Sequence, residues 1–72
     1  MNRDLNDIWN ECLQMFRENV PPQAYSTWFE PIKPVDYRDG LLTIQVPSDF
    51  FYEYLESRFI KVIKATIRKV LG

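Results

Sequence analysis

The feature that most constrains the fold is residues 25–32 (YSTWFEPI), a short segment that concentrates large apolar side chains just ahead of a proline. Trp28 and Phe29 are adjacent, so on a helix their side chains point about 100° apart and contact two neighbouring elements. Pro31 disfavours helical conformation at Glu30, and we expect the chain to leave this segment extended. The segment therefore predicts a short helix at the centre of the core, with Trp28 as a core residue.

A first helix is predicted ahead of this segment, with Asp4 or Asn6 as its N-cap and Pro21-Pro22 at its end. Apolar residues recur on one of its faces at helical spacing: Leu5, Ile8, Trp9, Cys12, Leu13 and Phe16. Proline is favoured in the first turn of a helix, so Pro22 also predicts the start of a second helix, over about residues 22–29.

Beyond Pro31 the apolar period changes from helical to strand-like. Residues 35–37 alternate, residues 38–40 (RDG) are a turn signal, and residues 42–46 alternate again. This pattern predicts a β-hairpin whose second strand points three side chains at the core: Leu42, Ile44 and Val46. Pro34 lacks an N–H donor, so the first strand is expected to be an edge strand or to start late.

After Pro47, Ser48 or Asp49 is expected to cap one long last helix over residues 49–71. Its predicted buried stripe is Phe51, Leu55, Phe59, Val62, Ile63, Thr66, Ile67 and Val70. The order is then α-α-β-β-α, an α+β fold in which a small antiparallel hairpin packs on helices. A two-stranded sheet is marginal alone. Either the helices cover it or a further strand belongs to the domain.

Length and composition favour one soluble domain over residues 1–72. A chain of this size buries only roughly 60% of its unfolded surface, which is enough for independent folding. The single cysteine excludes an internal disulfide framework and suits a reducing compartment. No apolar run reaches the length of a membrane span and no signal-peptide pattern opens the sequence, so we expect a cytoplasmic protein with no membrane partner.

Catalytic chemistry is poorly represented, and we expect no enzyme, no metal site and no cofactor. The chain has no histidine, so the usual acid/base group near neutral pH and the commonest metal ligand are both missing. Cys12 lies on the apolar stripe and is expected to be a packed thiol. With only Gly40 and Gly72, a glycine-rich phosphate loop is excluded.

Nucleic-acid binding has some support. Helix-and-sheet domains of this size include the KH class, which holds single-stranded nucleic acid through a G-x-x-G loop that this sequence lacks. The net charge is −1, so there is no overall basic field. Three cations of the last helix are candidate phosphate contacts, namely Lys61, Lys64 and Arg68. Tyr37, Tyr52 and Tyr54 are candidate base-stacking residues, although a solvated helix face and partly buried tyrosines explain the same pattern.

Protein–protein interaction is indicated by apolar side chains that exceed the needs of one core. Phe50 and Phe51 are adjacent at a helix start, so if Phe51 enters the core, Phe50 faces outward. The stripe of the first helix is wide enough to leave one edge near Ile8 and Trp9 exposed. Exposed aromatic residues are typical anchors of interfaces.

Several sequence blocks resemble one known family: Ile8-Trp9-x-x-Cys12-Leu13, Val20-Pro21, Tyr25-Ser26-x-Trp28-Phe29-x-Pro31-Ile32 and Leu42-x-Ile44-x-Val46-Pro47-x-x-Phe50. These blocks cover nearly the whole chain and are similar to the N-terminal domain of the bacterial replication initiators of the DnaA family. The resemblance implies a KH-like α+β fold. A third strand normally follows the last helix in that family, so it implies a strand that is absent or shortened after Gly72.

The resemblance also implies a function. It indicates an interaction domain that mediates initiator self-association and recruits the replicative helicase and regulatory proteins at the chromosomal origin. The ATPase and origin-binding parts of such initiators lie C-terminal to it. Residue by residue, self-association falls on Trp9 with Ile8 and Cys12 beside it, and helicase contact on Phe50. A second helicase and regulator contact, acidic in the family, falls on Ala24, which puts that contact in doubt or shifts it to Gln23 or Tyr25. Some members bind single-stranded DNA weakly, and the basic end of the last helix is where we expect that contact.

Overall fold

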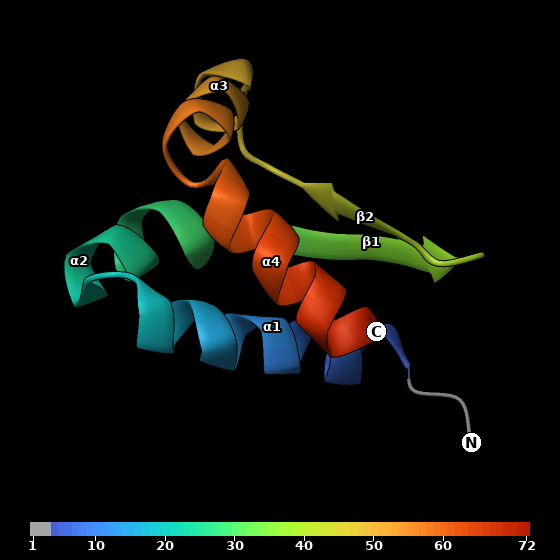
Figure 1. The fold of residues 1–72 in the computed structure, drawn as a ribbon. Coiled ribbons are helices and arrows are strands. Elements are labelled where there is room, and N and C mark those ends of the chain that lie inside the picture. The colour runs from blue at the N-terminus through green and yellow to red at the C-terminus, as the bar shows by residue number, and fades with distance from the viewer. Residues whose placement is uncertain (1–3) are drawn as a thin grey trace.

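The chain folds into helices packed around one β-hairpin, and the computed structural model describes residues 4–72 (Figure 1). The elements, in chain order, are α1 (Leu5–Asn19), α2 (Pro22–Ala24), the π-helix η1 (Tyr25–Phe29), β1 (Lys33–Arg38), β2 (Leu41–Gln45), α3 (Asp49–Arg58) and α4 (Ile60–Leu71). The predicted α+β class and element order are confirmed, with the last helical segment in two parts. The first three residues of the predicted 1–72 domain lie outside the described residues.

Helix α1 supplies one wall of the core. It begins as expected at Asp4, whose Oδ1 accepts a hydrogen bond from the Asp7 N–H at 2.8 Å. This cap satisfies one of the unpaired N–H groups of the first turn. The helix packs against α4, η1 and β1 with the predicted apolar stripe. Phe16 lies at the centre of this wall, with its ring 4.8 Å from that of Phe29 and 5.8 Å from that of Trp9.

The hairpin turns through Asp39 and Gly40, whose φ angles are +54° and +76°. Two central residues with positive φ define the type I′ turn, which matches the twist of the flanking strands. The register of the antiparallel pair slips between Pro34 and Asp36, and Val35 is left pointing to solvent at this bulge. Within residues 4–72 the sheet has two strands, so Pro34 lies on an edge strand as predicted. The three apolar side chains expected to face the core do so, partly buried: Leu42, Ile44 and Val46.

The segment at residues 22–29 is helical, as predicted, but its second half is a π-helix. The N–H of Glu30 donates to the carbonyl of Tyr25 at 3.0 Å, a spacing of five residues. Phe29 is completely buried, whereas Trp28 is only half-buried and packs against the edge of the core. Trp28 therefore belongs to the core at its edge, and the completely buried Phe29 takes the central place.

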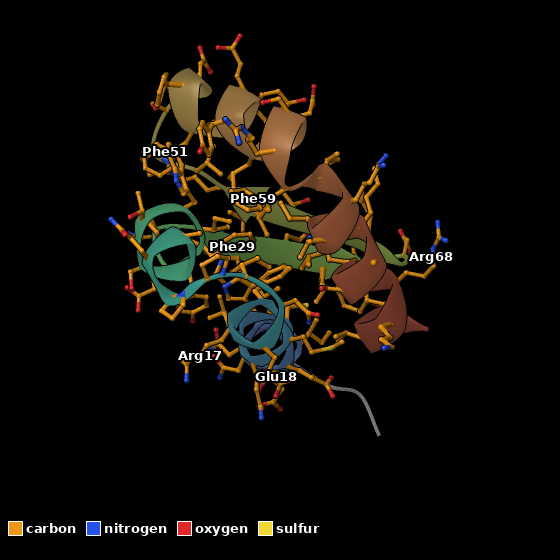
Figure 2. The ribbon with its side chains drawn as sticks, turned by 60° about the vertical axis from the view of Figure 1, so that its left-hand side comes forward. Arg17, Glu18, Phe29, Phe51, Phe59 and Arg68 are labelled. Carbon is orange, nitrogen blue, oxygen red and sulfur yellow. The ribbon has the colours of Figure 1, made fainter. Side chains whose placement is uncertain are left out.

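The last helical segment is broken at Phe59, so the prediction of one continuous helix over residues 49–71 is wrong. Phe59 has φ −120° and ψ 9°, which lies outside the helical region. A straight helix of that span would measure about 35 Å. It would therefore run the full longest dimension of the Cα trace, which is 35 Å. The break lets α3 and α4 cover different parts of the core. It also turns the Phe59 ring inward against Phe29, with centroids 5.2 Å apart (Figure 2).

Candidate interaction surfaces

Four aromatic side chains meet where η1 lies against α3, and we call this set the aromatic surface: Trp28, Phe50, Phe51 and Tyr54. The indole of Trp28 is its hub, with ring centroids 3.7 Å from Tyr54, 5.0 Å from Phe51 and 6.1 Å from Phe50. Phe50 is 65% exposed and the other three are half-buried. The expected outward position of Phe50 is confirmed. Trp28 was not identified from the sequence as part of this surface, because only the packing of α3 brings it there.

The first turn of α3 holds Phe50 in place. Ser48 is the N-cap, and its Oγ accepts a hydrogen bond from the Phe51 N–H at 3.3 Å. Asp49 adds a negative charge to the first turn, which the helix dipole favours. Phe50 therefore projects from an ordered helix start rather than from a loop. Binding then costs less conformational entropy than it would if the backbone at Phe50 had to be ordered first.

The second predicted helicase contact lies on α2 and the start of η1. Gln23 is exposed and Ala24 is half-buried, but Tyr25 is only 6% exposed. The Arg17 guanidinium lies 5.1 Å above the Tyr25 ring and donates to the Tyr25 hydroxyl at 3.5 Å. This hydrogen bond raises the pKa of Arg17 above its ordinary value. Since Tyr25 is buried and Ala24 half-buried, Gln23 is the most accessible of the three predicted contact residues.

The predicted self-association residues are all buried. Ile8 is 2% exposed, Trp9 is 4% exposed, and Cys12 is completely buried. The expectation that the stripe of α1 leaves an exposed edge at Ile8 and Trp9 is therefore wrong. The hairpin and α4 cover a wider part of this face than the helical pattern alone indicated, since α1 contacts both β1 and α4. Trp9 and Cys12 both belong to the core cluster.

The three predicted phosphate contacts lie on the solvent side of α4, and we call them the basic ridge: Lys61, Lys64 and Arg68. They follow one another at spacings of three and four residues, so they share one helix face. Figure 2 shows Arg68 pointing away from the body of the domain, on the side opposite η1. None of the three forms an ion pair with a residue of the described chain.

Two kinds of feature are absent from residues 4–72, a metal-ligand cluster and a membrane-spanning helix. Within that range, no group of three or more histidine, cysteine, aspartate or glutamate side chains is placed to hold a metal ion. No helix of the same range combines the length and apolar character that a membrane span needs.

The sequence was compared with known protein families. The family model described as the DnaA N-terminal domain matches residues 6–69, which is most of the chain. The chain belongs to the DnaA N-terminal domain family. This confirms the resemblance expected from the blocks around Trp9, Trp28 and Phe50.

Individual relatives agree with the DnaA assignment. The chain is 49% identical over 72 residues to the chromosomal replication initiator protein DnaA of Flavobacterium psychrophilum. It is 51% identical over 65 residues to that of Bacteroides fragilis and 42% identical over 65 residues to that of Chlorobaculum tepidum. These matches cover 90 to 100% of the chain but only 13 to 15% of each relative. The DnaA relatives are thus several times longer than the domain described here.

Proposed function

We propose that this chain is the protein–protein interaction domain of a DnaA-type replication initiator. In this role it recruits the replicative helicase and initiation regulators to the chromosomal origin and contributes to initiator self-association. It acts in the cytoplasm, without catalysis and without a cofactor of its own. The family assignment supports the replication role, and the aromatic surface supports the recruitment role.

The observation that carries the proposal is the exposed ring of Phe50 beside Trp28. A few anchor residues, many of them aromatic, dominate the binding energy of an interface. Phe50 is largely exposed, and the Trp28 ring lies beside it and also contacts the ring of Phe51. Gln23 and Ala24 precede Trp28 on the same helical segment, and the exposed Gln23 adds a polar side chain to it.

The proposed role in self-association is limited by the burial of Trp9. Because Trp9 is buried, its ring can contact a second copy of the domain only if α1 moves away from the core. Substitution of Trp9 therefore reduces self-association through loss of the fold as well as through loss of a contact. Weak association of this domain still matters in a longer initiator, since neighbouring origin sites raise the effective concentration.

The deciding experiment is a backbone-amide NMR titration of the domain with the replicative helicase of the same organism. Shifts are expected at α2, at residues 26–30 and in the first turn of α3. Phe50→Ala is expected to lower helicase affinity by roughly thirtyfold, the effect of truncating an interface hot spot of about 2 kcal/mol.

Tyr52→Ala is the matched control for Phe50→Ala. Tyr52 is a second exposed aromatic residue of α3, at 56% exposure, and it makes no contact with the Trp28 ring. The neighbouring Glu56 carboxylate raises the pKa of the Tyr52 hydroxyl above its ordinary value. We expect Tyr52→Ala to leave helicase affinity within about twofold. Equal losses in both folded variants would remove the aromatic surface from the recruitment site.

A second candidate function is favoured by the basic ridge. Three unpaired cations on one helix face are suited to the phosphates of single-stranded nucleic acid, and a KH-like module of this kind binds such strands. Its test is a salt titration, because phosphate contacts give a steep loss of affinity as salt is added. No binding of oligonucleotides at low salt would exclude this candidate and leave the recruitment role untouched.

A further inference from the structure

Helix α3 is held to the rest of the domain more weakly than α1. Leu55 is the only buried side chain among residues 49–58, whereas α1 buries four: Ile8, Trp9, Cys12 and Phe16. Figure 1 shows α3 at one end of the molecule, on the side away from α1, and its main packing partner is its chain neighbour α4. A segment with few buried apolar contacts opens at a lower free energy than the core of its domain.

One side of α3 is attached to η1 through aromatic rings. The Tyr54 ring lies face to face with the Trp28 indole at 3.7 Å, and the Phe51 ring lies 5.0 Å from the same indole. All three side chains are only half-buried, so this attachment lies at the surface of the domain. One aromatic pair contributes a small part of the stability of a whole domain. The attachment therefore opens more readily than the core unfolds.

The other side of α3 is loosely packed. A cavity of about 190 Å³ lies between α3, the end of the hairpin and α4, and its lining includes Leu55, Val46, Ile60 and Ile63. Native interiors hold few voids larger than a water molecule, and side chains that line a void lose the contacts that would fill it. The one buried residue of α3 therefore borders empty space on the side opposite the aromatic rings.

Helix α3 is also too short to persist once it is detached. It has ten residues, and isolated helices shorter than about 12–15 residues are marginal in water. Four of its residues are phenylalanine or tyrosine, which are weaker helix formers than alanine or leucine. The backbone is non-helical at both flanking residues, Ser48 and Phe59. Detachment of α3 is therefore expected to unfold it, with Phe59 as the boundary to α4.

We propose that α3 is a locally unfolding unit, which leaves η1 and unfolds between Ser48 and Phe59 while α1, the hairpin and α4 stay folded. Opening separates Phe50 from Trp28, so the aromatic surface exists only in the closed state. A partner that contacts both rings shifts the equilibrium towards that state. The opening itself does not depend on any partner, whereas this regulatory consequence rests on the proposed recruitment function.

The experiment measures native-state amide exchange of the domain by NMR. The amides of α3 are expected to exchange at least about tenfold faster than the protected amides of α1. Tyr54→Leu removes the ring stack but keeps an apolar side chain, and it should speed exchange in α3 by roughly 2- to 12-fold, the weight of one aromatic pair. Tyr52→Leu is the matched control, because Tyr52 makes no ring contact with Trp28, and it should stay within about twofold.

A second variant tightens α3 from the cavity side. Val46→Ile adds one methylene group to the cavity lining, and its burial should slow exchange in α3 by about fourfold. Val35→Ile makes the same chemical change on the exposed bulge of β1, where Val35 is 52% exposed, and it should leave exchange in α3 unchanged. Neither change is expected to alter exchange in α1.

Faster exchange in α3, with opposite responses to Tyr54→Leu and Val46→Ile, supports the locally unfolding unit. Equal protection of α3 and α1, or a Tyr54→Leu variant that speeds exchange equally in both, overturns it, because α3 then opens only when the whole domain unfolds. Addition of the replicative helicase should slow exchange in α3. Bound helicase with unchanged exchange in α3 overturns the regulatory link alone. Absence of helicase binding overturns the recruitment function and leaves the exchange result valid.

Discussion

The indole of Trp28 and the phenol ring of Tyr54 lie face to face, with centroids 3.7 Å apart and planes inclined by 8°. This stack joins η1 to the middle of α3, two elements that are separated in sequence by the hairpin. The same indole lies 5.0 Å from the Phe51 ring, so one side chain holds the first two turns of α3. The position of Phe50 relative to α2 therefore depends on Trp28.

Trp28→Ala is expected to weaken both the fold and helicase binding. Replacement of a fully buried aromatic residue by alanine costs about 3–5 kcal/mol, and about 2 kcal/mol is expected for the half-buried Trp28. Helicase affinity should fall although Phe50 is unchanged, because α3 loses its attachment to η1. Urea unfolding and the helicase titration measure the two effects separately.

Thr27→Ala is the control for this substitution, since Thr27 is the exposed neighbour of Trp28 on the same π-helix. It should change unfolding free energy by less than about 0.5 kcal/mol. A folded Trp28→Ala variant that binds helicase as the parent does would show that the stack is not what positions Phe50.

The main expected effect of Trp9→Ala is a loss of domain stability rather than the loss of an interface contact. The ring is 4% exposed and packs edge-on against Phe16 at 5.8 Å. A loss of about 3–5 kcal/mol is expected, a large part of the stability of a domain this small. Sedimentation should be run beside urea unfolding, with Trp9→Phe as the conservative variant. Abolished self-association at full stability would show instead that Trp9 opens to a partner in solution.

Most of the fold was predictable because its signals are local. The caps at Asp4 and Ser48, the helix-starting Pro22 and the Asp39-Gly40 turn each depend on a few neighbouring residues, and all four lie where expected. The exposure of Phe50 was predictable for a related reason. Two adjacent aromatic residues at a helix start point in different directions, and of this pair Phe51 is half-buried against Trp28 while Phe50 is exposed.

The misassigned residues depend on tertiary packing. Helical periodicity shows which face of α1 is apolar but not how much of it is covered. In the fold, α1 packs against β1 and α4, and both Ile8 and Trp9 are buried. No proline or glycine near Phe59 signals the break in the last helical segment. We attribute the break to packing, since the Phe59 ring lies against Phe29. The sequence indicated Trp28 as a core residue, and only the turn geometry of η1 shows that Phe29 is completely buried while Trp28 is half-buried.

The hairpin turn gives a local test of stability. Gly40 has φ +76°, and a non-glycine residue in this left-handed region is strained by roughly 1–2 kcal/mol. Gly40→Ala should therefore destabilise the domain by about that amount, although the new methyl group meets no atom within 4 Å. Asp39→Asn is the matched variant at the neighbouring position, and it should be neutral or slightly stabilising because Asn-Gly favours this turn. Thermal unfolding measures both, and unchanged stability in Gly40→Ala would mean that the turn adopts another geometry.

Ser48→Ala tests the link between helix capping and recruitment. The Ser48 Oγ accepts the hydrogen bond from the Phe51 N–H, and loss of such a cap costs about 1 kcal/mol. The first turn of α3 should fray, so amide exchange is expected to rise at residues 49–52 and helicase affinity to fall, since Phe50 must be ordered again on binding. Ser57→Ala is the control, because the Ser57 hydroxyl only donates to the Tyr54 carbonyl at 3.4 Å and caps no N–H group. Ser48→Asp keeps the capping acceptor and should restore both exchange protection and affinity. If Ser48→Ala speeds exchange in the first turn of α3 while helicase affinity stays constant, then Phe50 binds without needing a preformed helix start.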